Sequence, residues 1–580
     1  MKVLVLGHDT RAFLAVIRSL GRGGVEVHVA WHDPYAPASR SRYIRKAHLL
    51  PSWRQPVVSW KSSLQQLLRE EKFDLVLPCI DPIVMALHQH RTEFEPHGRI
   101  YLLSDTAFEV TFDKFKTTDL ARSLSIPVAR EIIVRSLTDI DRIRAEFELP
   151  VVLKPKASFV QEGGDRQMVR KVYSWEVMER HVEEMCSRGP VAVQENFIGR
   201  GVGVELLMQQ GEMLLAFQHM RLHEPMHGGG SSYRISVPLN PDLVNAAVRM
   251  LGHLHYTGVA MVEFKVNPET GRWLLIEING RFWGSLPLAV AAGADFPLAL
   301  AQLLVEGKTC FSREFRTGIC CRNFRADLSW QRANLHADRK DPTLASLPLP
   351  QVLWETVRNV ALLRERSDTF TWDDPMPGVA EIRSIANQGC ATVRRKICAR
   401  YLQLPWVRRE LRARALAAFE HSNIIGFVCA GNICRSPFAE RFAQMSFGPG
   451  RTFISAGLHS TSGRRVPEMA LRSAAQWNID LSGHRSAVVD PEFLARAKAI
   501  FVFDDYHGDA LRTQFPEARR KIHFLGVLQE KGLLFIADPF GKRSEVYDAT
   551  YRQIAEILLM LHPANSSLVG KPARKFPQST

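Results

Sequence analysis

The most informative stretch of this 580-residue sequence covers residues 424–437 and reads Ile-Ile-Gly-Phe-Val-Cys-Ala-Gly-Asn-Ile-Cys-Arg-Ser-Pro. It predicts a buried strand, a tight loop and the start of a helix. The loop between Cys429 and Arg435 is short enough for backbone N–H groups to point at one centre, where the helix N-terminus adds positive potential. Such a nest favours a thiolate at Cys429. Because the fork of Arg435 can hold two phosphate oxygens, the thiolate is a candidate nucleophile for a bound phosphate.

Further motifs follow this loop towards the C-terminus. They are Ser455-Ala456-Gly457, the run Asn478–Ser486 and Asp538-Pro539-Phe540, which follows an apolar run. Together with the loop they make residues 423–565 resemble the low-molecular-weight protein tyrosine phosphatases. The resemblance implies a phosphatase I-like, doubly wound α/β domain, and residues 566–580 would form a tail.

The resemblance also implies a chemistry that needs no cofactor. A phosphotyrosine protein or a small phosphomonoester would be hydrolysed through a phosphocysteine. The implied catalytic residues are Cys429 (nucleophile), Arg435 (phosphate ligand), Asp538 (general acid, then base), Ser436 (hydrogen bond to the sulfur) and Asn432, which with Ser455 would hold the loop.

Three details of this region keep alternatives open. Phe540-Gly541 stands where the family often has an aromatic pair, so the wall around a phenyl ring would be thinner. Cys434 is near enough to Cys429 for a reversible disulfide. Arsenate reduction through a cysteine relay would need a further cysteine, and none follows Cys434. A scaffold that binds phosphorylated partners without hydrolysis is another alternative.

Residues 1–110 are expected to form a doubly wound α/β domain. The apolar runs Val3–Leu6, Val25–Ala30 and Phe73–Pro78 are typical of parallel strands covered on both faces. Gly7 follows the first strand without the Gly-x-Gly-x-x-Gly pattern, which does not favour a dinucleotide site.

Residues 111–330 contain charged side chains in apolar surroundings. Lys154 lies within the apolar run Pro150–Pro155, where a cation is costly unless it meets an anion. Gly163-Gly164 predicts a mobile loop over phosphates. Residues 191–199 predict a strand that runs into a hinge.

A hairpin is predicted between residues 259–266 and 272–279. If the residues beside the turn pair with each other, Glu263 lies opposite Leu275.

One face of this hairpin gathers hard ligands. Because side chains alternate along a strand, Glu263, Glu277 and Asn279 share a face and offer two carboxylates and an amide oxygen to Mg²⁺. Arg281 has the same parity and can reach a phosphate. The alternative is a polar hairpin side that faces solvent.

In this order the motifs of residues 1–330 resemble the ATP-grasp superfamily, in its carboxylate–amine ligase or carbamoyl-phosphate-synthase-like branch. The resemblance implies a pre-ATP-grasp domain over 1–110 and an α+β ATP-grasp domain over 111–330. It implies Mg²⁺-dependent transfer of phosphate from ATP to a small-molecule carboxylate, followed by attack of an amine on the acyl phosphate. An ATP-binding module without turnover that regulates the phosphatase is the alternative.

The resemblance implies a role for nine residues of this part. They are Lys116 and Lys154 at the nucleotide phosphates, Gln194 and Glu195 at adenine, Glu205 at the ribose, Glu263, Glu277 and Asn279 at Mg²⁺, and Arg281 at the transferring group.

Residues 331–422 are expected to be a basic helical linker without a catalytic signature. Asp373–Gly378 is rich in turn residues, and arginines cluster among apolar residues between 394 and 414. A solvated or docked linker is the simpler interpretation. Weak attachment to an anionic membrane is the alternative.

Composition sets the remaining expectations. Nine cysteines without paired zinc spacing fit a reducing cytosol and a cytoplasmic protein. The net charge of +15 is attributed to anionic substrates and the basic linker rather than to nucleic acid. Asp295 and Pro297 interrupt the longest apolar stretch, Leu286–Val305.

Overall fold

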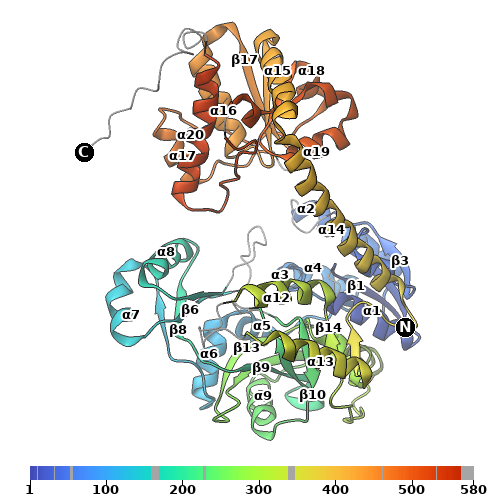
Figure 1. The fold of residues 1–580 in the computed structure, drawn as a ribbon. Coiled ribbons are helices and arrows are strands. Elements are labelled where there is room, and N and C mark those ends of the chain that lie inside the picture. Colours follow the sequence, from blue (N-terminus) through green and yellow to red (C-terminus); the bar gives the residue numbers. More distant parts are fainter. Residues whose placement is uncertain are drawn as a thin grey trace. The chain divides into compact units, whose positions relative to one another are not determined.

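The computed structural model describes residues 1–8, 11–31, 33–51, 57–157, 169–225, 230–337, 346–362, 364–459, 462–530 and 532–562. The chain divides into two compact units, Met1–Ala386 and Asn387–Thr580. Figure 1 shows the first unit in blue to yellow-green and the second mainly in orange to red. The predicted loop at Gly163-Gly164 lies outside the described residues.

The first unit begins with a parallel four-stranded sheet in the order β3-β2-β1-β4. The side chains of Val3 to Leu6 in β1 are completely buried, because helices cover both faces of the sheet. The doubly wound prediction for this region is confirmed. The strands are β1 (Lys2–Leu6), β2 (Glu26–Ala30), β3 (Ile44–His48) and β4 (Leu75–Pro78).

Two further sheets form the rest of the first unit. A four-stranded sheet has the order β5-β8-β6-β7 and a seven-stranded sheet the order β13-β12-β9-β10-β11-β14-β15. The strands are β5 (Glu131–Val134), β6 (Val151–Pro155), β7 (Arg170–Val172), β8 (Val191–Glu195), β9 (Arg200–Gln209), β10 (Glu212–His223), β11 (Tyr233–Ser236), β12 (Gly258–Val266), β13 (Trp273–Asn279), β14 (Cys320–Arg322) and β15 (Glu365–Ser367).

Helices cover these sheets and close one large core that β1, β9, β10 and β12 share. They are α1 (Ala12–Arg22), α2 (Val57–Glu71), α3 (Asp81–Gln89), α4 (Arg91–Phe94), α5 (Asp105–Phe112), α6 (Lys114–Ser123), α7 (Ile140–Glu146), α8 (Trp175–Cys186), α9 (Pro241–His253), α10 (Leu286–Ala292), α11 (Phe296–Ala301), α12 (Phe324–His336), α13 (Leu349–Ala361) and α14 (Met376–Leu402), which continues into the second unit.

The expected linker begins too early at residue 331. Strand β15 pairs in parallel with β14 and completes the seven-stranded sheet. Arg18 donates from Nε to Oδ2 of Asp374 over 2.9 Å, and Arg234 pairs with Asp368; all four side chains are almost inaccessible to solvent. The turn-rich residues therefore belong to the first unit, where Asp374 is buried.

The second unit has a parallel sheet in the order β17-β16-β18-β19, which confirms the doubly wound prediction for the C-terminal domain. Figure 1 shows α16, α17 and α20 on one side of this sheet and α15, α18 and α19 on the other. The elements are α15 (Pro405–His421), β16 (Ile424–Cys429), α16 (Arg435–Phe447), β17 (Thr452–Gly457), α17 (Glu468–Ala475), α18 (Pro491–Arg496), β18 (Ala499–Val502), α19 (Asp505–Gln514), β19 (Ile522–Phe524) and α20 (Ser544–Met560).

Helix α15 is part of this second core rather than of a linker. Ala415 and Phe419 are buried against the sheet. Arg408 donates to the backbone carbonyl oxygens of Gln529 and Gly532 over 3.0 and 2.8 Å. Apolar burial and these hydrogen bonds attach α15 to the second unit, so its guanidinium groups serve packing as well as charge.

Within the described residues, no single helix combines the length and apolarity of a membrane span. Leu286–Ala292 and Phe296–Glu306 meet the criterion only as a pair bent by 92°.

Candidate active sites

The loop after β16 surrounds the sulfur of Cys429 with hydrogen-bonding groups. The Oγ of Ser436 lies 3.1 Å from the Cys429 Sγ, and the backbone N–H of Asn432 donates to the same sulfur over 3.3 Å. The Cys429 side chain is only 3% exposed. Both groups can donate a hydrogen bond to the sulfur, so they would stabilise negative charge that develops on it.

Asn432 fixes the shape of this loop. Its φ of 51° lies in the left-handed region, which asparagine tolerates better than most residues. Its Nδ2 donates to the hydroxyls of Ser436 and Ser455 over 2.9 and 2.8 Å, and its carbonyl oxygen lies 2.9 Å from Nε2 of His484. The loop is therefore held from two sides before any ligand arrives.

Arg435 connects the loop to two acidic groups. Its Nη1 donates to Oδ2 of Asp504 over 2.9 Å and to the carbonyl oxygen of Ile536 over 3.0 Å. Its Nη2 lies 3.0 Å from Oδ2 of Asp538, while its buried Nε has no hydrogen-bond partner among the described residues. The unused Nε–H leaves one donor of the guanidinium fork for an anion.

Asp504 is a site residue that the sequence interpretation did not assign. It follows β18 and caps α19, accepting the backbone N–H of His507 over 3.0 Å. Burial alone would raise the pKa of this carboxyl, but the His507 hydrogen bond and the charge of Arg435 lower it to about 2. Its position at the carboxyl end of a parallel strand was the available signal.

Asp538 and Phe540 lie at the open side of the loop. The Asp538 side chain is 47% exposed, and its Oδ1 accepts the backbone N–H of Phe540 over 3.2 Å. The Phe540 ring is 54% exposed. A carboxyl group and an aromatic face are thus available to a leaving group that enters from solvent.

Cys434 is a free, buried thiol, as is Cys429. Burial and the neighbouring Cys429 raise the pKa of Cys434 to about 12. A thiol that stays protonated is a poor nucleophile. The disulfide between these two cysteines stays a prediction.

The hairpin of the first unit brings the three predicted metal ligands together, in a register different from the expected one. Glu263 lies opposite Glu277 rather than Leu275, because Val266 pairs with Trp273 instead of Arg272 and a β-bulge between Glu263 and Phe264 shifts the register once more. The Nδ2 of Asn279 lies 3.2 Å from Oε1 of Glu263 and 3.5 Å from Oε1 of Glu277. The Nη2 of Arg221 lies 2.6 Å from Oε2 of Glu263 and balances the negative charge of that carboxylate.

Lys114, rather than Lys116, reaches this cluster. The Lys114 Nζ lies 3.3 Å from Oε2 of Glu277. Lys116 points elsewhere and pairs with Glu109 at the surface. The side chain of Lys114 also lines a pocket with Asp81, Thr111, Glu277 and Asn279. Lys114 is thus the lysine of α6 that lies beside the predicted metal ligands, and a phosphate contact of Lys116 stays a prediction.

Lys154 is buried at the end of β6, as its apolar run predicts. Burial and the nearby charge of Lys114 lower its pKa to about 8, although Glu277 and Glu131 oppose this shift. Burial by itself would raise the pKa of Glu277, but Lys114 and Lys154 outweigh it and lower the pKa to about 2. The carboxylate of Glu277 is thus ionised at neutral pH and available to a cation.

Arg281 is oriented by a residue from the N-terminal sheet. Its guanidinium forms two hydrogen bonds with the Asp81 carboxylate, of 2.8 and 2.9 Å. Asp81 begins α3 just beyond the carboxyl end of β4, the usual ligand position in a parallel sheet. The site therefore draws residues from both expected N-terminal domains.

Glu205 does not occupy a position from which it can contact a ribose. Its side chain is completely buried in β9, 2.5 Å from Nδ1 of His219 and 3.4 Å from the hydroxyl of Ser285. Burial raises the pKa of Glu205 well above its usual value and lowers that of His219. The two groups form a neutral pair in the core, which corrects the assignment of Glu205.

Gln194 and Glu195 lie on β8 and both bind the neighbouring β5 side of the sheet. The amide of Gln194 donates to the Glu131 carboxylate, and Glu195 accepts the backbone N–H of Arg130 over 3.0 Å. Their contact with adenine stays a prediction.

Comparison with known proteins separates the two halves of the chain. Residues 424–570 match the family model of low molecular weight phosphotyrosine protein phosphatases. Over 127 residues, 22% of the chain, the sequence is 32% identical to the probable low molecular weight protein-tyrosine-phosphatase EpsP of Ralstonia nicotianae and covers 85% of it. The chain belongs, in this part, to the low molecular weight protein-tyrosine-phosphatase family.

Other members of the phosphatase family are similar over the same region. The chain is 33% identical over 129 residues to the low molecular weight protein-tyrosine-phosphatase Wzb of Escherichia coli and covers 86% of it. It is 31% identical over 132 residues to a protein-arginine-phosphatase of Geobacillus stearothermophilus and covers 88% of it.

The phosphatase is fused to an ATP-grasp segment. Residues 188–325 match the family model described as ATP-grasp in the biosynthetic pathway with Ter operon. Similar solved structures include the biotin carboxylase domain of Hydrogenobacter thermophilus 2-oxoglutarate carboxylase, with a TM-score of 0.45, 17% identity, and coverage of 55% of this chain and 73% of that chain. The L-amino acid ligase of Bacillus licheniformis gives a TM-score of 0.43, 16% identity, and coverage of 55% and 78%.

The ATP-grasp cluster fits a magnesium ion by its donor set. Two carboxylates converge on one amide, and rotating the Asn279 side chain would exchange its nitrogen for an oxygen ligand. Lys114 and Arg221 compensate these carboxylates in the structure. The fit therefore needs no movement of the strands.

Proposed function

We propose that the second unit hydrolyses phosphomonoesters of the phosphotyrosine type through a phosphocysteine at Cys429. The main support is the arrangement at the end of β16. The Cys429 sulfur accepts the backbone N–H of Asn432, lies 3.1 Å from the Ser436 hydroxyl, and shares its short loop with an arginine that has an unused donor. Family membership and the exposed Phe540 ring support the substrate class.

In the proposed first step the Cys429 Sγ attacks phosphorus and the bond to the leaving oxygen breaks. Asp538 donates a proton to that oxygen, and Arg435 with the loop amides holds the phosphoryl oxygens. In the second step water attacks phosphorus and gives a proton to Asp538. Sulfur then leaves as a thiolate that Ser436 and Asn432 stabilise.

Cys429→Ser tests this assignment. The variant should hydrolyse p-nitrophenyl phosphate at a rate near background, because a serine hydroxyl in this loop is not ionised at neutral pH. Cys398→Ser, which changes an exposed cysteine of α14, is the matched control and should retain full activity. Substantial turnover by Cys429→Ser would exclude a phosphocysteine at this residue.

We propose in addition that the first unit is an ATP-dependent ligase that activates a small carboxylate as an acyl phosphate for an amine. Bound Mg²⁺ would neutralise phosphate charge at Glu263, Glu277 and Asn279. Lys114 and Lys154 would position the ATP phosphates, and Arg281 would stabilise the transferring group. The pocket between α3, α6 and β13 supports this assignment.

ADP release by the full chain tests the ligase proposal. Carboxylates and amines are screened in pairs with Mg·ATP, in a Cys429→Ser background that removes phosphatase turnover. If one carboxylate–amine pair stimulates ADP release, and Glu277→Gln abolishes that stimulation, the result supports the ligase proposal. ATP binding without stimulation by any pair would favour a nucleotide-sensing module instead.

A further inference from the structure

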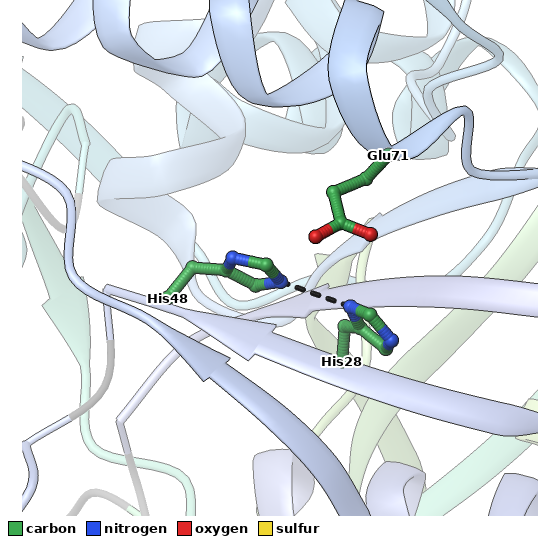
Figure 2. A group of neighbouring side chains, drawn as sticks. All are labelled: His28, His48 and Glu71. Carbon is green, nitrogen blue, oxygen red and sulfur yellow. Dashed lines mark hydrogen bonds between the residues drawn. The ribbon is translucent and has the colours of Figure 1, made fainter.

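A group of three ligand side chains lies outside both proposed active sites, at the edge of the N-terminal sheet. Figure 2 shows His28 from β2 and His48 from β3 with their rings adjacent, and the Glu71 carboxylate from the end of α2 directed towards them. One ligand atom of each residue lies within 4.8 Å of those of the other two. Among the described residues this is the one such group of three histidine, cysteine or acidic side chains.

Glu26 determines which nitrogen of His28 is free. The Nε2 of His28 lies 2.9 Å from Oε1 of Glu26, a carboxylate that can only accept. Nε2 therefore carries the proton, and Nδ1 of the neutral ring presents a lone pair to the group. A carboxylate on the outer nitrogen is the usual partner of a metal-binding histidine, because it fixes the tautomer and the ring orientation.

The free Nδ1 of His28 faces a second ring nitrogen. It lies 2.9 Å from Nε2 of His48, and the two rings are stacked at an interplanar angle of 27°. Two nitrogens bound to one Zn²⁺ at about 2.0–2.1 Å and a tetrahedral angle are about 3.3 Å apart. The two ring nitrogens would therefore have to move apart by only a few tenths of an ångström to hold an ion, and the strands could keep their positions.

The surroundings hold the ligands while leaving access from one side. His28 is 3% exposed, whereas His48 and Glu71 are half-buried. Strand β3 is the outermost strand of its sheet, so an ion can enter over its edge. Phe73 packs its ring edge-on against both imidazoles, at centroid distances of 5.3 and 6.1 Å, which fixes their planes.

Two ammonium groups compete for the Glu71 carboxylate. Lys2 reaches Oε2 and Lys46 reaches Oε1, each over 2.5 Å. The Lys46 side chain is 56% exposed and can turn into solvent without losing packing. An ion would therefore take over the Glu71 oxygen that Lys46 holds, and binding would be weakened by the nearby positive charge.

We propose that His28, His48 and Glu71 form a binding site for a borderline divalent cation such as Zn²⁺, with Glu26 as the positioning residue. Two neutral imidazoles and one carboxylate suit Zn²⁺ or Co²⁺ rather than Mg²⁺. Three protein ligands leave a fourth position for water. The ion would join β2, β3 and α2, and so stabilise the edge of the sheet.

Metal titration of the full-length, untagged protein tests the site. The protein is first stripped with a chelator, in a Cys429→Ser background that removes the reactive thiol of the phosphatase loop. Binding of Zn²⁺ is measured by calorimetry, and Co²⁺ by the visible bands of a tetrahedral complex. The background protein should bind one more Zn²⁺ per chain than the same protein with His48→Ala, and only the former should show the Co²⁺ bands.

Two charge variants separate a metal site from a hydrogen-bonded cluster. Lys46→Gln removes the competing ammonium and should tighten Zn²⁺ binding about tenfold. Lys61→Gln, which removes a similar charge that pairs with Glu93 elsewhere in the unit, is the matched control and should leave the affinity unchanged. Glu26→Gln should weaken binding by about 10- to 100-fold, as loss of a positioning carboxylate does.

The melting temperature provides a second measurement if His48→Ala is poorly folded. Added Zn²⁺ should raise the melting temperature of the Cys429→Ser protein, and raise it further with Lys46→Gln. Equal Zn²⁺ stoichiometry with and without His48→Ala, or no response of affinity and melting temperature to Lys46→Gln, would overturn the proposal. Either result would leave a histidine pair held by a shared proton.

Discussion

Arg435 and Asp538 form an ion pair across the mouth of the phosphatase loop, with 3.0 Å between Nη2 and Oδ2. When no substrate is present, the Asp538 carboxylate therefore occupies one of the Arg435 donors that we propose for phosphate. A phosphate dianion would displace the carboxylate, and this displacement would free Asp538 to reach the leaving oxygen. Substrate binding and positioning of the acid become one event.

Replacing Asp538 by asparagine should slow hydrolysis by roughly 10²–10⁴-fold, as expected for loss of a general acid. Aryl phosphates with good leaving groups should lose less, because they need less protonation. The variant should also bind inorganic phosphate more tightly, since the competing negative charge is gone. Rates and inhibition constants are measured over a leaving-group series; an equal loss across the series would argue against proton donation by Asp538.

Asp504 should contribute to stability in a pH-dependent way. Its folded pKa of about 2 lies below the usual value of about 4, so its contribution is complete above about pH 4 and disappears as pH falls through 2. Asp504→Asn should therefore lower the free energy of unfolding by about 2 kcal/mol at pH 7 and by much less at pH 2. Urea titrations of both proteins at several pH values measure this difference; a difference independent of pH would contradict the assignment.

The two lysines at the start of α6 form a matched pair for the nucleotide site. Lys114→Met should weaken Mg·ATP binding by roughly 10- to 100-fold, the cost of one charge-assisted hydrogen bond. Lys116→Met should have little effect, because Lys116 pairs with Glu109 at the surface. Calorimetric titration with a non-hydrolysable ATP analogue compares them, and the reverse order of effects would return the role to Lys116.

Glu277→Gln should abolish Mg²⁺-dependent nucleotide binding, because it removes the ionised carboxylate of the hairpin cluster. Glu109→Gln, an exposed carboxylate of α5, serves as the control of equal charge change. Titrating Mg²⁺ at a fixed concentration of a non-hydrolysable ATP analogue measures how nucleotide binding depends on Mg²⁺ in each protein. An unchanged magnesium requirement in a folded Glu277→Gln protein would place the metal elsewhere.

Fragment boundaries should follow the two cores. A fragment of residues 403–580 keeps α15 whole and should hydrolyse aryl phosphates at close to the full-length rate. A fragment of residues 418–580 removes buried Val407 and Ala415 and should aggregate. Solubility and turnover are compared for both; a soluble, active shorter fragment would show that α15 is dispensable for the core.

Four of the five predicted phosphatase residues could be predicted because they are close in sequence, whereas Asp538, which is distant in sequence, was assigned only through the family resemblance. Cys429, Asn432, Arg435 and Ser436 share one short loop, and its strand and helix leave few ways to arrange them. Asp504 escaped prediction because its pairing with Arg435 spans 69 residues and depends on strand order. A short motif predicts the geometry of its own loop. The order of strands in a sheet depends on packing over the whole domain, so a short motif does not predict it.

The ATP-grasp residues were predictable as a group and less so one by one. Alternation along the hairpin placed Glu263, Glu277 and Asn279 together, but the bulge between Glu263 and Phe264, which contributes to the pairing of Glu263 with Glu277, has no clear sequence signal. Glu205 was assigned to the ribose through the family resemblance, which gives a position along the chain but not its burial. In β9 both faces are buried, and one oxygen of the Glu205 carboxyl, Oε1, lies within hydrogen-bonding distance of His219 and Ser285 instead.

The pairs Arg234–Asp368 and Arg18–Asp374 join residues that are 134 and 356 positions apart. A ribosome makes the arginines long before their carboxylates. Until about residue 374 has left the exit tunnel, these guanidinium groups have no partner and their buried positions are unfavourable. The nascent N-terminal unit therefore cannot reach its final packing until nearly all of its own residues have been made, and a chaperone or protease would meet an unfinished unit throughout that interval.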